Sequence, residues 1–309
     1  MLSRIAEALY WIGRYTERAE DTARILDVHY HLLLEDRWVD EAAAGATLLE
    51  VMGIDVDDEL GATDGEAVAR ILAFGGDGTG SIVSSLTHAW HNARGARDAV
   101  SSEMWECLNA THQALDAGPA VADEQGAYAF FHWVKERSAT FAGLAESTMS
   151  RDDGWRFLLL GRSLERVDMS ARLLSAGYAE TWGDAAWVTT LRSCGAHEAY
   201  LRTYQRSVEG PLAAEFLVLD RLFPRSVFAA LGTAETCLAE LGPSSGRAGT
   251  DDDGRRCLGR ARGELEFCTV DDLADDLPDR LRRLQRHCSD AATAIAERYF
   301  HDTAPLEWA

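Results

Sequence analysis

The chain has 309 residues, 47% of them apolar, which is enough for a large folded core and too many for a disordered or fibrous protein. Its 30 Lys and Arg residues against 51 Asp and Glu give a formal net charge of −21, which repels phosphate backbones and anionic lipid surfaces. We therefore expect neither nucleic-acid binding nor attachment to a membrane by charge.

The first residues and the cysteines indicate the compartment. Glu7 and Arg14 interrupt the first apolar stretch, which disfavours a signal peptide, and no apolar run approaches the roughly eighteen residues that a membrane helix needs. None of the 6 cysteines forms a Cys-x-x-Cys pair, and their spacing suits neither a zinc ribbon nor a dense disulfide framework. We expect a cytoplasmic protein with reduced thiols.

Helical periodicity runs through nearly the whole chain. Apolar or small residues recur three or four apart over residues 5–33 and predict one long amphipathic helix. Alternating strand patterns are absent from the sequence, and Gly-rich or acidic stretches at 75–80, 242–254 and before Pro278 predict loops. The fold class is therefore all-α: a multi-helix bundle, taken as a single domain over 1–309 with halves of about 1–150 and 151–309. The further predicted helices cover residues 38–52, 63–74, 81–117, 120–148, 153–178, 184–208, 211–231, 233–241, 255–268 and 278–301.

An internal repeat is the most informative feature. Residues 13–27 (GRYTERAEDTARILD) align without a gap on residues 161–175 (GRSLERVDMSARLLS). Most of the shared positions are polar, whereas a repeat that only rebuilt a core would agree mainly at apolar positions. The pairs that agree or keep their chemistry are Gly13/Gly161, Arg14/Arg162, Glu17/Glu165, Arg18/Arg166, Glu20/Asp168, Thr22/Ser170, Ala23/Ala171, Arg24/Arg172 and Leu26/Leu174.

Helix geometry predicts where these charges point. At about 100° per residue, Arg14, Glu17 and Arg24 share a stripe with Tyr10, opposite an apolar face. Because charged and apolar residues mix on this stripe, we expect both faces of each repeat helix to be covered. A pseudo-two-fold axis relating the two helices would then bring two Arg-Glu-Arg rows toward one central polar site.

A plainer interpretation remains open. Arg14 with Glu17, and Arg162 with Glu165, fit ordinary surface pairs three residues apart, each worth roughly 0.2–0.5 kcal/mol. The functional interpretation instead requires buried charges that are fully paired or that a ligand completes.

Stretches in order along the chain resemble one known family. They are MLSRIAEALYWIGRYTERAEDTARILDV at the start, RDAVSSEMWE at 97–106, LGRSLERVDMSARLL at 160–174, LRSCGAHEAY at 191–200 and FLVLDRLFPRSV at 216–227. The chain resembles the bacterial alpha-E domain family over most of its length. Two departures are a Gly-rich loop before Ser81 and His197 at a position where an aromatic residue is expected.

The resemblance implies an all-helical protein encoded beside, or fused to, circularly permuted ATP-grasp-like ligases and transglutaminase-like proteins. A part in amide or peptide chemistry follows from that association. The motif residues that carry over are Arg14, Glu17, Arg18, Arg24, Glu103, Glu106, Glu165, Arg166, Arg172 and Glu198.

Two functional hypotheses follow, of which we favour the first and keep the second as the alternative, and whether the chain is an enzyme stays open. In the first, the chain binds a carboxylate-bearing amino acid or peptide-like substrate in an Arg/Glu-lined centre. In the second, it is a noncatalytic helical partner that docks on the ligase. The first assigns substrate carboxylates to Arg14, Arg18, Arg162 and Arg166, proton transfer to Glu17, Glu165, Glu103 or Glu198, and supporting contacts to Arg24, Arg172 and Glu106.

Other constellations are weaker. Neither Glu-x-x-His nor His-Glu-x-x-His occurs, so we expect no metal or cofactor, with a carboxylate-only magnesium or manganese site left open.

His29 and His31 are expected on a helix surface. Ser193 and Cys194 share a predicted helical turn with His197 as a weak nucleophile and base, although buried cysteines mostly act as small apolar residues. The Gly-x-Ser-x-Gly match at 242–246 lacks the sheet that a nucleophile elbow needs, and the glycines at 75–80 predict a turn that starts a helix.

Overall fold

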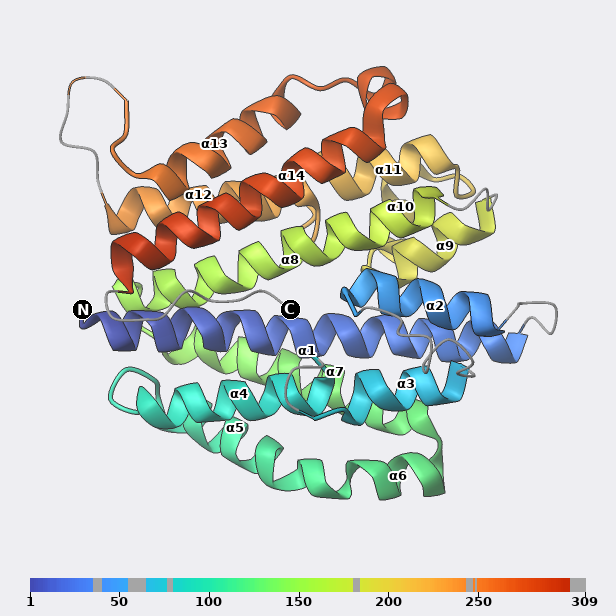
Figure 1. Ribbon diagram of the computed structural model, residues 1–309, viewed down its shortest axis with the longest axis horizontal. Helices are drawn as coiled ribbons and strands as arrows, with labels where there is room; N and C mark the ends of the chain where they lie inside the picture. Colours follow the sequence, from blue (N-terminus) through green and yellow to red (C-terminus); the bar gives the residue numbers. More distant parts are fainter. Residues whose placement is uncertain are drawn as a thin grey trace. The chain divides into compact units, whose positions relative to one another are not determined.

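The computed structural model describes residues 1–35, 41–54, 65–76, 80–179, 184–242, 247 and 249–300. These residues form 14 α-helices, α1 to α14, and a short 3-10 helix, and they contain no strand (Figure 1). The all-α prediction is confirmed. The predicted helix starts at 38 and 63, and the predicted loop residues 77–79 and 243–246, lie outside the described residues. None of the helices in the described ranges has both the length and the apolar content needed to span a bilayer.

The chain divides into two compact units. Unit 1 contains Met1–Arg14 and the described residues from Ser150 onward, and unit 2 contains Tyr15–Met149. The helix α1 (Ser3–Glu35) contributes its first part to unit 1 and the remainder to unit 2. The division after Met149 falls beside the boundary predicted between the two halves, except that the first residues belong with the second half.

Unit 1 is built around α8. The helix α12 packs along α8 and α13, while α14 packs on α13 and α8, and Leu160, Leu231, Leu238 and Ile295 are fully buried among them. The bounds of these helices are α8 Asp153–Ala179, α9 Asp184–Ser193, α10 His197–Tyr204, α11 Gly210–Leu219, α12 Val227–Leu241, α13 Asp253–Glu266 and α14 Val270–Tyr299.

Unit 2 contains the rest of α1 and six further α-helices. The helix α5 packs against α4 and α7, α6 packs against α7, and α3 contacts both α2 and α4. Phe130, Phe131, Leu72 and Met104 are buried in its core. The bounds are α2 Glu41–Met52, α3 Gly65–Phe74, α4 Ile82–Gly95, α5 Ser102–Ala114, η1 Leu115–Ala117, α6 Gly118–Gln125 and α7 Ala127–Thr148.

Several predicted helices are interrupted. The predicted helix 81–117 breaks between α4 and α5, because the Ser101 hydroxyl accepts a hydrogen bond from the Met104 backbone and starts a new helix there. The predicted helix 184–208 breaks at Gly195, whose φ of 61° lies in the left-handed region that glycine tolerates. Conversely, α12 runs through Gly232, where the prediction placed a helix boundary.

The helix α14 begins earlier than the predicted start at 278. Thr269 and Asp272 form a reciprocal capping box that satisfies the first backbone amides of α14. Asp276, two residues before Pro278, has non-helical backbone angles, which marks a kink at this proline. The predicted acidic loop is therefore the first turns of a kinked helix.

Candidate functional site

The repeated glycines lie where α1 meets α8 inside unit 1. A Cβ atom on Gly13 would lie 2.1 Å from the carbonyl oxygen of Leu158, and one on Gly161 would lie 2.0 Å from that of Tyr10. Glycine therefore permits a backbone approach that any side chain would block. The contact is reciprocal, since Tyr10 and Leu158 hold equivalent positions before the aligned glycines, but the pseudo-two-fold relation of the wider repeat stays a prediction.

An ion pair joins the two repeat copies one residue beyond this contact. Nε of Arg14 donates to Oε2 of Glu165 at 2.7 Å, and Nη1 of Arg14 donates to the Tyr10 hydroxyl at 3.2 Å. The side chains of Arg14 and Glu165 are only 4% and 1% exposed. Because Arg14 pairs with a residue of another helix and both are buried, the plainer interpretation as surface pairs is wrong for these two residues.

The surroundings of Arg14 stabilise its charge. Burial alone would lower the pKa of Arg14, but the electrostatic interactions with Tyr10, Glu165 and Asp168 raise it above its ordinary value. The guanidinium also lies 5.7 Å from the centre of the Trp11 ring, within cation–π distance. Arg14 is thus a permanently charged group held entirely by neighbouring protein atoms.

Cys288 and Tyr10 complete the buried cluster. Burial raises the pKa of the Cys288 thiol, and Asp168 raises it further, so this thiol stays protonated and unreactive at neutral pH. Burial likewise raises the pKa of the Tyr10 hydroxyl, which keeps it a neutral partner for Arg14. Glu165 occupies Nε of Arg14 and Tyr10 contacts its Nη1, so the buried cluster joins α1 to α8.

The other arginines of the rows have different surroundings. Arg24 bonds Glu20 at 2.7 Å and Arg172 bonds Asp168 at 3.0 Å, so equivalent positions of the two copies make the same pair one helical turn apart. Arg166 donates to the Pro224 carbonyl at 3.4 Å. Arg18, Arg162 and Arg166 are half-buried.

The predicted glutamates separate into two groups. Glu17 and Glu165 are 2% and 1% exposed, and both faces of α1 are covered as predicted, with Ile12 and Ala19 fully buried. Glu103 and Glu106 on α5 and Glu198 on α10 are exposed to solvent. These three carboxylates therefore do not belong to the buried cluster around Arg14, contrary to the prediction of one shared centre.

The weak nucleophile and base pair is not supported either. Ser193 ends α9 and His197 begins α10, with the turn at Gly195 between them, so they share no helical turn. Ser193 and Cys194 are buried, whereas His197 is half-buried. Within the described ranges no group of ≥ 3 His, Cys, Asp or Glu side chains is arranged to hold a metal ion.

His29 lies inside unit 2, and the prediction of a surface position is wrong for it. It is 6% exposed, whereas His31 is exposed as expected. The sequence contains the missed signal: His29 follows Leu26 by three residues and precedes Leu33 by four, which is the spacing of a buried helix face. Nε2 of His29 has no hydrogen-bond partner among the residues described.

The burial of His29 predicts a pH dependence of stability. Desolvation lowers its pKa from 6.5 to about 4. Between these values the unfolded chain binds a proton that the folded chain excludes, so the free energy of unfolding falls as the pH decreases. We expect the free energy of unfolding of the wild-type protein to fall by about 2 kcal/mol between about pH 7 and about pH 5 because of His29. This fall should be absent from His29→Leu.

Urea denaturation of unit 2 at the two pH values measures this effect. His31→Leu is the matched control, because His31 is half-exposed on the same helix and should leave the pH dependence unchanged. If the free energy of unfolding changed with pH equally in wild type and His29→Leu, the pKa of His29 would not be lowered by burial.

Comparisons with known proteins give one family. A family model described as a predicted alpha-helical domain with a conserved ER motif matches residues 1–300, and Glu-Arg stands at 17–18 and 165–166 in the two repeat copies. Three relatives, uncharacterized proteins of Mycobacterium bovis and of two Mycobacterium tuberculosis strains, are each 26% identical over 94% of this chain. The chain spans only 36% of the length of these relatives. No solved structure matches the chain.

Proposed function

The chain belongs to the alpha-E family, and on that premise we propose that it is a noncatalytic helical component of an ATP-grasp-linked system of amide or peptide chemistry, which docks on the ligase. The observation that carries the docking role is the state of Arg14 and Glu165. Both are buried and bonded to each other, so this arginine and this glutamate of the duplicated motif are occupied inside the fold. A component whose most distinctive charges are internal acts through its surface.

Unit 1 presents a surface suited to docking. Leu222 and Phe267 are 92% and 86% exposed, the largest values among the exposed large apolar residues described. The Arg221–Glu266 ion pair, at 2.6 Å, joins the residues that precede them, so Leu222 and Phe267 follow two segments that meet on unit 1. Exposed apolar residues beside charged ones are typical of the anchors of protein interfaces.

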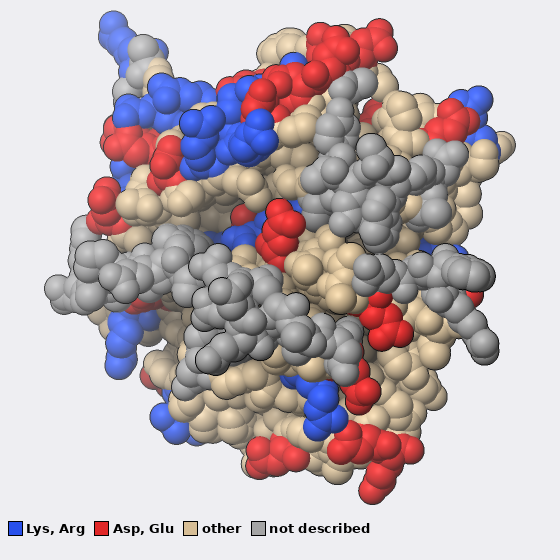
Figure 2. Space-filling model, turned by 45° about the vertical axis from the view of Figure 1, so that its right-hand side comes forward, with Lys and Arg blue, Asp and Glu red and all other residues tan. Residues whose placement is uncertain are grey.

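The adjacent surface adds a charge pattern. Arg255, Arg256 and Arg260 of α13 line a shallow hollow with Glu235 and Thr250. Figure 2 shows Lys and Arg side chains gathered over the region of α13, next to acidic side chains along the upper edge. In a chain of net charge −21, such a basic area favours an acidic patch on the partner.

The lengths of the relatives also support a docking role. Each relative aligns with this chain over only 36% of its own length, so the alpha-E segment is covalently joined to further sequence there. Association of an alpha-E segment with further protein is therefore a property of the relatives, and the proposed docking extends it to this chain.

A substrate-binding role is the second candidate. Arg162 and Arg166 on α8 are only half-buried, so a small carboxylate could reach their guanidinium groups from solvent. In that case the ligand would be an amino acid or a peptide-like substrate, as the family association implies.

Capture of the ligase separates the two candidates. We expect the tagged chain to co-purify with the ATP-grasp-like ligase that the family association implies, and the variant Leu222→Asp/Phe267→Asp to lose about 2–4 kcal/mol of binding free energy. Calorimetry with the purified ligase measures the loss.

Leu2→Asp is the matched control, because Leu2 is 69% exposed in the same unit. It precedes α1, whereas Leu222 and Phe267 follow α11 and α13. Equal ligase affinity of the double variant and wild type would contradict this docking surface. Thermal stabilisation by amino acids or short peptides, lost in Arg166→Gln, would favour the substrate-binding candidate.

A further inference from the structure

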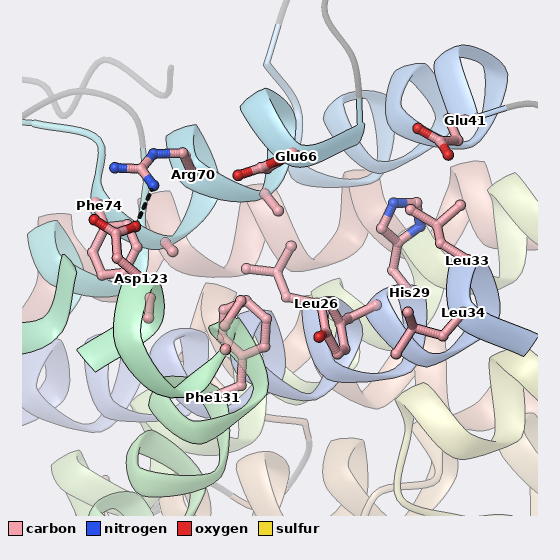
Figure 3. A pocket seen from close by; sticks show the side chains of 16 residues that line it. Leu26, His29, Leu33, Leu34, Glu41, Glu66, Arg70, Phe74, Asp123 and Phe131 are labelled. Carbon is pink, nitrogen blue, oxygen red and sulfur yellow. Dashed lines mark hydrogen bonds and ion pairs between the residues drawn. The ribbon is translucent and has the colours of Figure 1, made fainter. Parts of the chain in front are cut away.

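Unit 2 contains a cavity that the proposed docking function does not use. Its volume is about 340 Å³, which is within the range of small-molecule sites. The helices α1, α3, α6 and α7 supply most of the lining, and Glu41 of α2 closes one side. Leu26, Leu33, Phe74 and Phe131 give the cavity an apolar body (Figure 3).

His29 is a buried polar residue in the lining of this cavity. Figure 3 shows its imidazole rising from α1 toward Glu41, between Leu26 and Leu33. The residue is 6% exposed, and its Nε2 has no hydrogen-bond partner among the described residues. Because an unsatisfied buried polar atom is destabilising, a ligand that bonds Nε2 would recover that free energy.

The ring is neutral at physiological pH. Burial lowers the pKa of His29 to about 4, so its ring is neutral, with one nitrogen that carries a proton and one that can accept a hydrogen bond. In the tautomer protonated at Nδ1, the acceptor is Nε2, the nitrogen without a partner among the described residues. A neutral imidazole facing an apolar cavity therefore suits a ligand that has an N–H donor.

The charged side chains at the rim of the cavity determine which ligand charge it favours. The carboxylates of Glu41, Glu66 and Asp123 line the cavity with one guanidinium, that of Arg70. Arg70 is bonded to Asp123 at 2.8 Å and also interacts with Glu66, so the three carboxylates outnumber the one guanidinium and leave the rim negative. Figure 3 shows the Glu41 carboxylate beside the His29 imidazole, whereas that of Glu66 extends toward Arg70. The rim therefore favours a cation and disfavours a carboxylate.

We infer that this cavity binds a small primary amine with an apolar body, such as an alkyl- or arylalkylammonium ion. The apolar body packs against Leu26, Phe74 and Phe131, and the ammonium group donates to Nε2 of His29 on the side of Glu41. An amine is one of the two reactants of amide-bond formation. The ligand's part in such chemistry rests on the proposed function, whereas its binding does not.

Calorimetry on the whole chain tests the inference with three probes of similar size. The probes are 2-phenylethylamine, the neutral ethylbenzene and the anionic phenylacetate. We expect the amine to bind about tenfold more tightly than ethylbenzene and phenylacetate to bind least, because only the amine gains a hydrogen bond to His29 and attraction from the rim. The ring resonances of His29 should shift on addition of the amine.

Two variants assign the binding energy to particular groups. His29→Leu and Glu66→Gln should each lower the affinity for the amine about tenfold and leave the affinity for ethylbenzene unchanged. His132→Leu and Glu124→Gln are matched controls, because both residues are exposed in the same unit outside the cavity lining. Glu66 is exposed, so Glu66→Gln remains informative even if His29→Leu alters the fold.

Three results would overturn the inference. They are the absence of amine binding at millimolar concentration, tighter binding of phenylacetate than of the amine, and equal amine affinity in wild type and His29→Leu. A protein that still captures the ligase but does not bind the amine would leave the proposed function intact. Amine binding without ligase capture would overturn the proposed function and retain the cavity.

Discussion

Gly161→Ala is expected to reduce the free energy of unfolding of unit 1 by about 3 kcal/mol or more, and Gly13→Ala by a similar amount. The added methyl groups would lie 2.0 Å and 2.1 Å from the carbonyl oxygens of Tyr10 and Leu158. These neighbours are helix backbone, which cannot rotate away as a side chain would. The helices α1 and α8 must therefore move apart at Gly13 and Gly161, which would also weaken the buried contacts around Arg14.

Chemical denaturation of the variants, followed by circular dichroism, measures the effect. Gly263→Ala is the matched control, because Gly263 lies inside α13 of the same unit with no atom within 4 Å of its Cβ position. That variant should gain up to about 1 kcal/mol from helix propensity. Wild-type stability for Gly161→Ala would show that the two helices do not approach as closely as the structure places them.

Glu165→Ala is expected to destabilise unit 1 by about 3–5 kcal/mol, since it leaves the Arg14 guanidinium buried without its carboxylate partner. The pair is held at 2.7 Å with both side chains almost fully buried. Arg14→Met should be similarly costly, because it removes the guanidinium that is bonded to the buried Glu165 carboxylate. The free energies of unfolding from urea denaturation give both values.

The double variant Arg14→Met/Glu165→Leu should recover most of this loss, because apolar residues of similar volume avoid the desolvation of both charges. The exposed pair Arg206–Glu209, with side chains 56% and 49% exposed, supplies the control. Glu209→Ala should change the free energy of unfolding by less than about 1 kcal/mol. If Glu165→Ala were as mild as Glu209→Ala, the Arg14–Glu165 pair would not be the buried contact described here.

The sequence predicted most of the helices because local periodicity determines them. The 3.6-residue pattern in 5–33 predicted α1 (Ser3–Glu35) nearly to its ends. Local reasoning failed where the chain turns without a strong breaker, as at Ser101, whose capping hydroxyl is compatible with either a helix interior or its start. Pro278 predicted a helix start, whereas the capping box at Thr269 begins the helix earlier and the proline is accommodated by a kink.

The candidate site was predicted in part. The polar agreement between 13–27 and 161–175 indicated that Arg14 and Glu165 are special, and both are buried. Their direct bond could not be inferred, because the distance between two helices depends on tertiary packing, here on the approach at Gly13 and Gly161. The burial of His29 was missed because its chemistry suggested a surface position while its spacing from Leu26 and Leu33 indicated the interior.

The central claim is that the duplicated Arg/Glu motif holds the fold together and that the function resides on the surface. Ligase capture by the folded double variant Arg14→Met/Glu165→Leu tests it most directly, measured by calorimetry beside wild type at one temperature. The account predicts the same affinity for both proteins, since neither side chain is exposed to a partner. A double variant that folds with wild-type stability but no longer binds the ligase would contradict it and return Arg14 and Glu165 to a functional role.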